Sequence, residues 1–416
     1  MRGIWLIIII VAICVLAGLL LFLFLFRGQS MTVESPASEE NLGGTLSLST
    51  DRDSSEINPA VGVTDISPEE IAARGTIVDI NEDEASARLQ ILQRVIDSAV
   101  ISPTLSAEEA HIQYYDVYDE EIRTTNLVGD DQQTLDFPLH IVGKIIWAND
   151  KNSYVYESPG EGTFFAGLDG EEDVALGDLV KSPVFVGPDN VLAYHFADLA
   201  HDNSTVSIGN PAQGLQDYLV LARLRGNVIV KNIPGTEKIA YYLSPNVNRQ
   251  AAIYTVNLEG SQTEIISSKS YAMDAKWSPD GSKMVYTKLG DNGRPQLYLA
   301  DGNGQNSYPL TYSTYVEKIV FSQTANKMYM AVPSELPRIA DFYGKGVKTT
   351  DRIFEVDLES GEAWELYDLV ATAGGFGAFN LFLSSEEKLL YFTDDTDSNL
   401  YVFNIAKFYR ELAEAE

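Results

Sequence analysis

Cysteine is almost absent from this sequence of 416 residues, because its one cysteine, Cys14, lies in an apolar stretch near the N-terminus. The rest of the chain therefore has neither a disulfide bond nor a thiolate metal site. Basic residues are also scarce, since 29 lysines and arginines stand against 60 aspartates and glutamates. Binding of nucleic acid requires a basic face, so the charge balance argues against a nucleic acid as the partner.

Histidine is rare as well, and its positions do not indicate a metal centre. The four histidines are His111, His140, His195 and His201. None of them stands four residues from another, the spacing that would place two ligands on one face of a helix. We therefore expect surface or turn histidines, and the sequence predicts neither a metal site nor a cofactor.

Motifs of catalysis and phosphate binding are missing too. The chain contains no G-x-S-x-G nucleophile elbow, no G-x-x-x-x-G-K-[ST] loop and no G-x-G-x-x-G after a strand. The acidic segments 79–84 and 394–399 lack the glycine and glutamate that a helix-loop-helix calcium site needs. A solvated turn is the simpler interpretation of the second segment, with looser calcium binding by Asp394, Asp395 and Asp397 as the alternative.

One long hydrophobic run is present, at residues 4–26, which contain no charged side chain. As a helix this run would span about 34 Å, enough for the roughly 30 Å hydrocarbon core of a membrane. The sequence predicts an uncleaved single-span anchor with a cytoplasmic N-terminus and the rest of the chain outside, in a periplasm or at a cell surface. A cleaved signal peptide is the alternative, although its apolar stretch is usually shorter.

Polar residues dominate the segment that follows. Residues 28–66 are rich in Ser, Thr, Glu, Gly and Asn and favour a flexible tether. In "SPEEIAARG", Ser67 can cap a short helix that Gly75 ends, with a solvated loop as the alternative. The expected divisions are an anchor over 1–27, a tether over 28–75 and a folded domain over 76–416.

The folded part contains a repeat. The stretch "KWSPDGSKMVYTK" at 276–288 reads as two short strands around a Ser-Pro-Asp-Gly turn. Six similar units occur, and successive aligned tyrosines are 38 to 47 residues apart, except for a last step of 62. Each tyrosine is expected in the core between repeats. The aligned tyrosines are Tyr114, Tyr156, Tyr194, Tyr241, Tyr286, Tyr329 and Tyr391.

Two further strands follow the tyrosine in most copies, such as "AIYTVNLEG" and "TEIISS". Four short strands every 40 or so residues predict an all-β fold, a β-propeller of seven blades, with six or eight as alternatives. Residues 87–97 are expected to supply the missing last strand and close the ring; a helix is the alternative. Residues 333–351 form an insertion between the second and third strands of the sixth blade, expected to project from a rim. The glycines of 373–379 are expected to let the chain enter the narrow centre.

The segments "KWSPDGSKMVYT" and "LYLADGNGQNSYPLT" resemble the TolB-like propeller repeat, also found in the propeller of dipeptidyl peptidase IV-type proteins. The similarity is closest from Ala275 to Thr311 and extends as an array over roughly residues 96–405. Elsewhere it departs from the pattern, since "WANDKNSYVYES" lacks the proline and the glycine. The resemblance implies a scaffold that presents loops and an axial channel to partners. It transfers no functional residue, because the shared positions are turn and packing residues.

These observations favour a non-enzymatic, membrane-anchored binding or scaffold protein whose propeller meets a protein, a peptide or an envelope polymer. A structural subunit of a larger envelope assembly is a related hypothesis. The alternative from a different class is a propeller enzyme, a hydrolase or lyase acting on glycans in the axial funnel. A cluster of Asp, Glu and His on the inner face would favour the enzyme, whereas a funnel of Ser, Thr and apolar groups would contradict it.

Overall fold

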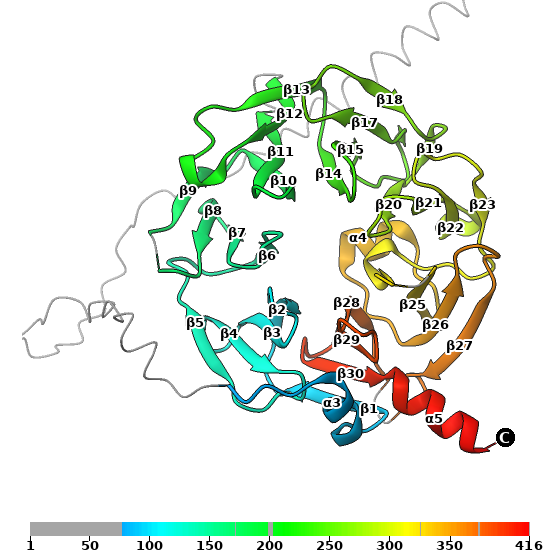
Figure 1. Ribbon diagram of the computed structural model, residues 1–416. Coiled ribbons are helices and arrows are strands. Elements are labelled where there is room, and N and C mark those ends of the chain that lie inside the picture. Colours follow the sequence, from blue (N-terminus) through cyan, green and yellow to red (C-terminus); the bar gives the residue numbers. More distant parts are fainter. Residues whose placement is uncertain (1–76, 171, 199–202, 325, 373–374, 416) are drawn as a thin grey trace, which may run out of the picture. The chain divides into compact units, whose positions relative to one another are not determined.

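The computed structural model describes residues 77–170, 172–198, 203–324, 326–372 and 375–415. Within these residues the chain forms seven four-stranded antiparallel sheets placed around a central axis (Figure 1). In the first six sheets the strands pair in chain order, with the first strand nearest the axis. The all-β fold and the seven blades predicted from the sequence are therefore confirmed.

The first four blades cover residues 100–265. Blade one contains β2 (Val100–Leu105), β3 (His111–Asp116), β4 (Glu121–Asn126) and β5 (Gln133–Asp136). Blade two contains β6 (Lys144–Trp147), β7 (Ser153–Ser158), β8 (Gly162–Gly167) and β9 (Val174–Gly177). Blade three contains β10 (Val180–Val186), β11 (Val191–Asp198), β12 (Asn203–Gly209) and β13 (Leu219–Leu224). Blade four contains β14 (Val228–Ile233), β15 (Lys238–Leu243), β17 (Tyr254–Asn257) and β18 (Thr263–Ile265).

The remaining blades complete the ring. Blade five contains β20 (Asp274–Trp277), β21 (Lys283–Leu289), β22 (Pro295–Asp301) and β23 (Tyr308–Pro309). Blade six contains β24 (Ile319–Phe321), β25 (Lys327–Pro333), β26 (Asp351–Asp357) and β27 (Ala363–Asp368). Blade seven contains β28 (Ala378–Leu383), β29 (Leu389–Asp394), β30 (Leu400–Asn404) and β1 (Leu92–Ile96). Outside the blades lie β16 (Gln250–Ala251), paired with β19 (Ser270–Tyr271), the helices α3 (Glu82–Arg88), α4 (Ile339–Lys345) and α5 (Ile405–Ala415), and the 3₁₀ turns η2 (Pro211–Gln213), η3 (Asp291–Gly293) and η4 (Val316–Lys318).

The N-terminal strand closes the ring, as the sequence predicted. Strand β1 pairs antiparallel with β30, with Leu92 opposite Phe403. Helix is confined to the residues up to Arg88, so the alternative of a helix over 87–97 is wrong. Closure is secured by the buried carboxylate of Glu82, which accepts hydrogen bonds from the hydroxyls of Ser384 (2.6 Å) and Ser385 (2.9 Å) in the turn between β28 and β29. Strand β1 therefore covers the edge of β30 and gives the last blade its fourth strand.

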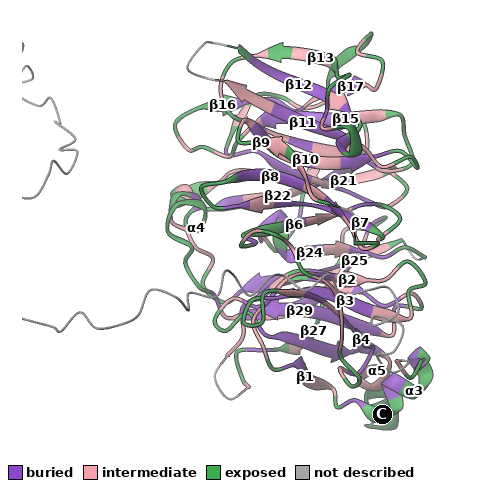
Figure 2. Ribbon diagram, turned by 90° about the vertical axis from the view of Figure 1, so that its left-hand side faces the viewer, coloured by how far each residue is buried: buried purple, intermediate pink, exposed green. Residues whose placement is uncertain are grey.

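The aligned tyrosines occupy the second strand of each blade and are all buried, at 9 % exposure or less. Alternation along β21 separates its neighbours as expected, because Val285 packs with blade six while Met284 and Tyr286 pack with blade four. Figure 2 shows the buried residues running along the strands of the stacked blades. The repeat is thus a packing repeat, which explains why its shared residues carry no chemistry.

The insertion of blade six lies between β25 and β26, as predicted, and contains α4. Its expected projection from the rim is wrong. Phe342 of α4 stacks on Tyr315 with 3.5 Å between ring centroids, and its centroid lies 5.8 Å from that of Phe379 in the innermost strand β28. Burial of this apolar face folds the insertion back over the inner strands, so that α4 lies on one face of the propeller (Figures 1 and 2).

Two further expectations concern the glycines before β28 and the N-terminal segment. A Cβ atom at Gly377, just before β28, would lie 2.3 Å from the Asp395 carboxyl group, so the side chain of Asp395 crowds this position. The anchor, the tether and the short helix at 67–75 lie outside the described residues. Among the residues that are described, no helix is long and apolar enough to cross a membrane.

Candidate active site in the axial channel

A cavity of about 770 Å³ opens among the inner strands of blades two to six. Its walls come from the first strands β6, β10, β14 and β20, from the ends of β7 and β11, and from η4, which precedes β24. Most of the polar residues of the lining are ionisable; Ser182, Asn227 and Ser244 are the other polar ones, and the rest of the lining is apolar. The ionisable residues of the lining are Lys144, Glu157, Lys181, His195, Lys231, Asp274 and Glu317.

Lysines form an arc on one side of this cavity, one from each of three successive inner strands. Lys144 begins β6, Lys181 is the second residue of β10, and Lys231 lies in β14. Within the described part of the chain, no carboxylate lies at ion-pair distance from any of the three. Lys276, in β20 of the next blade, is not part of the cavity lining, and it donates a hydrogen bond to the Ile319 carbonyl. The arc offers positive charge to an anionic ligand in a chain that is otherwise acidic.

The position of Lys181 depends on an irregularity of its strand. The pairing of β10 with β11 shifts between Lys181 and Val184, and Ser182 there has a φ of +48°. A bulge of this kind bends the strand and changes the direction of the neighbouring side chains. The Ser182 hydroxyl accepts a hydrogen bond from the Val230 amide (2.9 Å), which ties the bulge to the inner strand of blade four.

A pair of carboxyl groups lines the same cavity. Asp274 begins β20 and is buried, and it accepts hydrogen bonds from the hydroxyls of Tyr242 (2.6 Å) and Tyr343 (2.9 Å). Glu317, in η4, lies with one carboxyl oxygen 3.5 Å from the same Tyr343 hydroxyl. Two carboxyl groups that face one hydroxyl at this distance cannot both ionise without repulsion, so the pair holds a proton readily.

The surroundings shift the pKa values of two side chains, Glu317 and Lys276, toward neutral pH. Enclosure by the channel walls, followed by the charge of Asp274, raises the pKa of Glu317 to about 7. Glu317 is nevertheless an exposed residue of the channel wall, so water screens part of this effect. Burial, followed by the charge of Lys231, lowers the pKa of Lys276 to about 8. An acid and a base that both titrate near neutral pH are suited to proton transfer.

The raised pKa of Glu317 predicts a pH dependence of stability. The folded state binds this proton more tightly than the unfolded chain, so its contribution is complete below pH 4.5 and is lost as the pH rises through about 7. We expect Glu317→Gln, which cannot ionise, to gain stability relative to the wild type across this range. Denaturant unfolding at several pH values measures the difference. A difference that stays constant with pH would contradict the shift.

The histidines do not gather. His195 was expected at the surface or in a turn, but it is buried in β11, where its Nε2 lies 2.7 Å from the Ser204 hydroxyl and burial lowers its pKa to about 4. His111 pairs with Asp79, and His140 with Glu161. His201 lies outside the described residues.

The acidic turn at 394–399 is used for structure. The Asp394 carboxylate accepts a hydrogen bond from the Gly377 amide (2.9 Å), and Asp395 accepts one from the Thr349 amide (2.7 Å). Asp397 accepts one from the amide of Asn399 (2.9 Å). These bonds fix the turn beside the start of β28.

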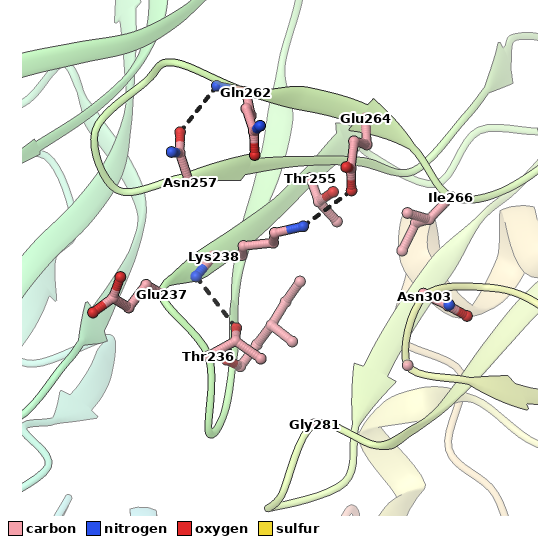
Figure 3. Close-up of a pocket in the computed structure, with 12 residues that line it drawn as sticks. Thr236, Glu237, Lys238, Thr255, Asn257, Gln262, Glu264, Ile266, Gly281 and Asn303 are labelled. Carbon is pink, nitrogen blue, oxygen red and sulfur yellow. Dashed lines mark hydrogen bonds and ion pairs between the residues drawn. The ribbon is translucent and has the colours of Figure 1, made fainter.

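A second cavity, of about 490 Å³, lies between blades four and five and is shown in Figure 3. Lys238 and Glu264 of its lining pair with each other at 3.0 Å. The backbone amide of Gln262 donates a hydrogen bond to the side-chain oxygen of Asn257 (3.1 Å), which holds their turn. This outer cavity has no counterpart of the carboxyl pair, so the axial cavity is the better candidate for chemistry.

Known structures resemble the propeller, whereas no protein-family model matches the chain. An oligogalacturonate lyase in complex with manganese matches with a TM-score of 0.54 and 12 % identity, over 76 % of this chain and 94 % of that chain. An oligogalacturonate lyase from Vibrio parahaemolyticus matches with a TM-score of 0.55 and 11 % identity, over 75 % and 93 %. The tricorn protease matches with a TM-score of 0.51 and 12 % identity, over 77 % of this chain and 34 % of that chain. At these identities the likeness shows a common β-propeller fold.

The comparisons contradict the expectation of a non-enzymatic binding or scaffold protein. That expectation rested on the predicted anchor, the repeat and the missing catalytic motifs. In the oligogalacturonate lyases, 93–94 % of an enzyme's chain aligns with this propeller, so a chain that is mostly propeller can carry an activity. The charged lining of the axial cavity is also the feature that favours the enzyme alternative over the scaffold.

Manganese accompanies one of the similar structures. The described residues of this chain contain no group of three or more His, Cys, Asp or Glu side chains that could hold a metal ion. In the axial cavity, Asp274 is engaged by two tyrosine hydroxyls and His195 by Ser204. The residues present do not fit a metal centre, and no chemical step is derived through one.

None of the axial residues other than His195 was singled out from the sequence. The lysines are visible in the sequence, because the first strands of four successive repeats each contain one: Lys144, Lys181, Lys231 and Lys276. Lys231 and Lys276 both stand 10 residues before their aligned tyrosines, whereas Lys144 and Lys181 stand 12 and 13 residues before theirs, so the alignment superimposes only Lys231 with Lys276. Glu317 and Tyr343 belong to a turn and an insertion outside the repeat.

Proposed function

We propose that this chain is a lyase that cleaves an oligosaccharide of uronic acids in the axial channel. The observation that carries the proposal is that an arc of lysines from successive inner strands and the Asp274–Glu317 pair line one cavity. The similarity to oligogalacturonate lyases supports the same class of substrate.

The lysines would bind the substrate. Each uronic acid unit carries one carboxylate, and inner strands of neighbouring blades present Lys144, Lys181 and Lys231 in turn. The chain carries a formal charge of −31, which would repel a polyanion from most of its surface. A locally basic channel would therefore guide such a ligand to the axis.

The acid and the base would carry out an elimination. The neutral amine of Lys276 would remove the proton from the carbon beside the uronate carboxylate. The electron pair of that C–H bond would form a carbon–carbon double bond as the C–O bond to the neighbouring sugar breaks. Glu317 would give its proton to the departing oxygen, which yields a sugar hydroxyl and an unsaturated uronate.

Elimination suits the carboxyl pair better than hydrolysis does. Glycoside hydrolases place their two carboxyl groups on either side of the scissile bond, with the sugar between them. Here Asp274 and Glu317 face the same tyrosine hydroxyl, so no sugar fits between them. Only one of the two is then available as the acid.

The test is to incubate the purified full chain with oligogalacturonate and with a neutral xylo-oligosaccharide of similar length. We expect ultraviolet absorbance from the new conjugated double bond, and unsaturated products by mass spectrometry, with oligogalacturonate alone. No product from oligogalacturonate, or equal cleavage of the neutral sugar, would overturn the proposal.

A pair of lysine variants tests the role of the arc. Lys231→Gln removes one positive charge from the axial cavity, whereas Lys238→Gln removes one from the outer cavity. We expect the first to raise KM for oligogalacturonate by about tenfold, in line with the loss of one charged contact, and the second to leave it unchanged. Steady-state kinetics at two salt concentrations measures both. Equal effects would show that overall charge, rather than the arc, governs binding.

A further inference from the structure

Tyr343 reaches the carboxyl pair from outside the blade repeat. It lies in α4, within the insertion of blade six, and its hydroxyl is 2.9 Å from Asp274 Oδ2 and 3.5 Å from Glu317 Oε2. A hydroxyl between two acidic groups can donate to one and accept from the other. Because Asp274 is the closer neighbour, the tyrosine proton points to Asp274, and its oxygen is left to accept a proton from Glu317.

We propose that Tyr343 is a positioning residue that holds the proton of the carboxyl pair on Glu317, so that the insertion of blade six completes the active site. The catalytic use of this proton rests on the proposed function. The placement of the proton can be measured without any substrate.

The hydrogen bonds of Asp274 favour this placement. Its carboxylate accepts from the Tyr242 hydroxyl (2.6 Å), the Tyr343 hydroxyl (2.9 Å) and the Ala275 amide (2.9 Å). Donors directed at a carboxylate stabilise its ionised form, so the single proton of the pair is displaced to the partner that receives fewer donors. The partner is Glu317, an exposed residue of the channel wall.

The insertion is held firmly enough to place a hydroxyl. Ile339 of α4 is buried, and the Phe342 ring stacks on Tyr315 with 3.5 Å between centroids. The Tyr315 hydroxyl donates to the Pro337 carbonyl (2.9 Å) just before the helix. Gly346 ends α4 in the left-handed conformation, with φ of +57°, and its amide bonds to the Phe342 carbonyl (3.2 Å). Tyr343 is therefore fixed by its neighbours on both sides.

Several charged or titratable groups surround Glu317 and belong in any account of its protonation. Asp274 and Lys276 come from β20, Lys231 from β14, and Tyr343 from α4, while Lys318 follows Glu317 directly. The charges of the lysines favour the ionised form of Glu317, whereas the charge of Asp274 favours its protonated form. A change at Tyr343 that leaves all of them in place isolates the contribution of one hydroxyl.

The first measurement is the carboxyl titration of Glu317 by NMR in protein labelled with ¹³C-glutamate, with the signal assigned by its loss in Glu317→Gln. In Tyr343→Phe the ring, and hence the enclosure, is kept and only the hydroxyl is removed. We expect the titration midpoint of Glu317 to fall from about 7 toward its ordinary value of 4.5. An unchanged midpoint would overturn the inference.

Tyr315→Phe is the matched control. It removes another hydroxyl bonded to the insertion, but one whose hydrogen bond goes to Pro337 and not to the carboxyl pair. We expect the Glu317 midpoint to stay near its wild-type position in this variant. If both variants lower the midpoint equally, docking of the insertion, and not the Tyr343 hydroxyl, sets the protonation, and the inference fails.

Kinetics on oligogalacturonate separates this inference from the proposed function. We expect Tyr343→Phe to lower kcat about tenfold with little change in KM, as for a partly lost general acid. Activity falls at high pH when Glu317 loses its proton, and in this variant the fall should begin at a lower pH. A wild-type chain without activity but with the midpoint shift would refute the lyase and keep the proton placement. Activity together with an unshifted midpoint would do the reverse.

Discussion

Replacing Glu317 by glutamine is expected to reduce turnover of oligogalacturonate by about 10²–10⁴-fold, the usual contribution of a general acid. The amide keeps the size and the hydrogen-bonding capacity of the side chain but has no proton to give to the departing oxygen. The lysine arc is untouched, so we expect KM to change by less than about threefold. The loss should therefore appear in kcat.

The pH profile of the wild type provides the second half of this prediction. Glu317 must be protonated and Lys276 neutral, so activity should rise and fall around a maximum between about pH 7 and 8. In Glu317→Gln the residual activity should lose the decline on the high-pH side. Glu237→Gln in the outer cavity is the matched control, for which no change is expected. A variant that retains wild-type turnover would remove Glu317 from the mechanism.

The fold was predictable because it depends on features that recur. A buried tyrosine in the second strand of every blade, such as Tyr114 and Tyr391 at the two ends of the array, fixes the repeat length and the blade count. Ring closure followed from the missing last strand, and β1 supplies it through pairs such as Leu92 with Phe403. These are local patterns of packing, and a single sequence contains them in full.

The candidate site was not predictable, for a geometric reason. Asp274, Glu317 and Tyr343 come from three places in the chain and meet only when blades five and six pack together and the insertion folds over the inner strands. Nothing in the sequence around residues 333–351 shows that Phe342 packs inward, and the expectation of a projecting rim loop was wrong for that reason. Chemistry that converges from different blades leaves no motif.

Replacing Lys318 by methionine is expected to cost about 3–5 kcal/mol of folding free energy, the range for breaking a buried ion pair. Lys318 and Asp351 are both fully buried, with Nζ 2.6 Å from Oδ2. The Lys318 ammonium also donates to the Thr349 hydroxyl (2.9 Å) and to the Ala378 carbonyl (3.1 Å), which links blade six to the first strand of blade seven. Methionine would leave the Asp351 carboxylate buried without its countercharge.

Burial lowers the pKa of Lys318 and raises that of Asp351, so desolvation outweighs the mutual attraction at each partner. The cost of the single variant should therefore be largely the isolated charge. The double variant Lys318→Met with Asp351→Leu removes both charges and should recover part of the loss, limited by the Ala378 amide, which loses its acceptor.

Lys327→Met is the control for this pair, since Lys327 bonds to Glu355 at 3.1 Å in a partly exposed setting and should cost no more than about 1 kcal/mol. Urea unfolding of the three variants measures the differences. Equal losses at Lys318 and Lys327 would contradict the argument, and a double variant as unstable as the single would assign the loss to the hydrogen bonds. Because Lys318 follows Glu317 directly, the same buried pair that joins blades six and seven also fixes the turn that carries the proposed acid.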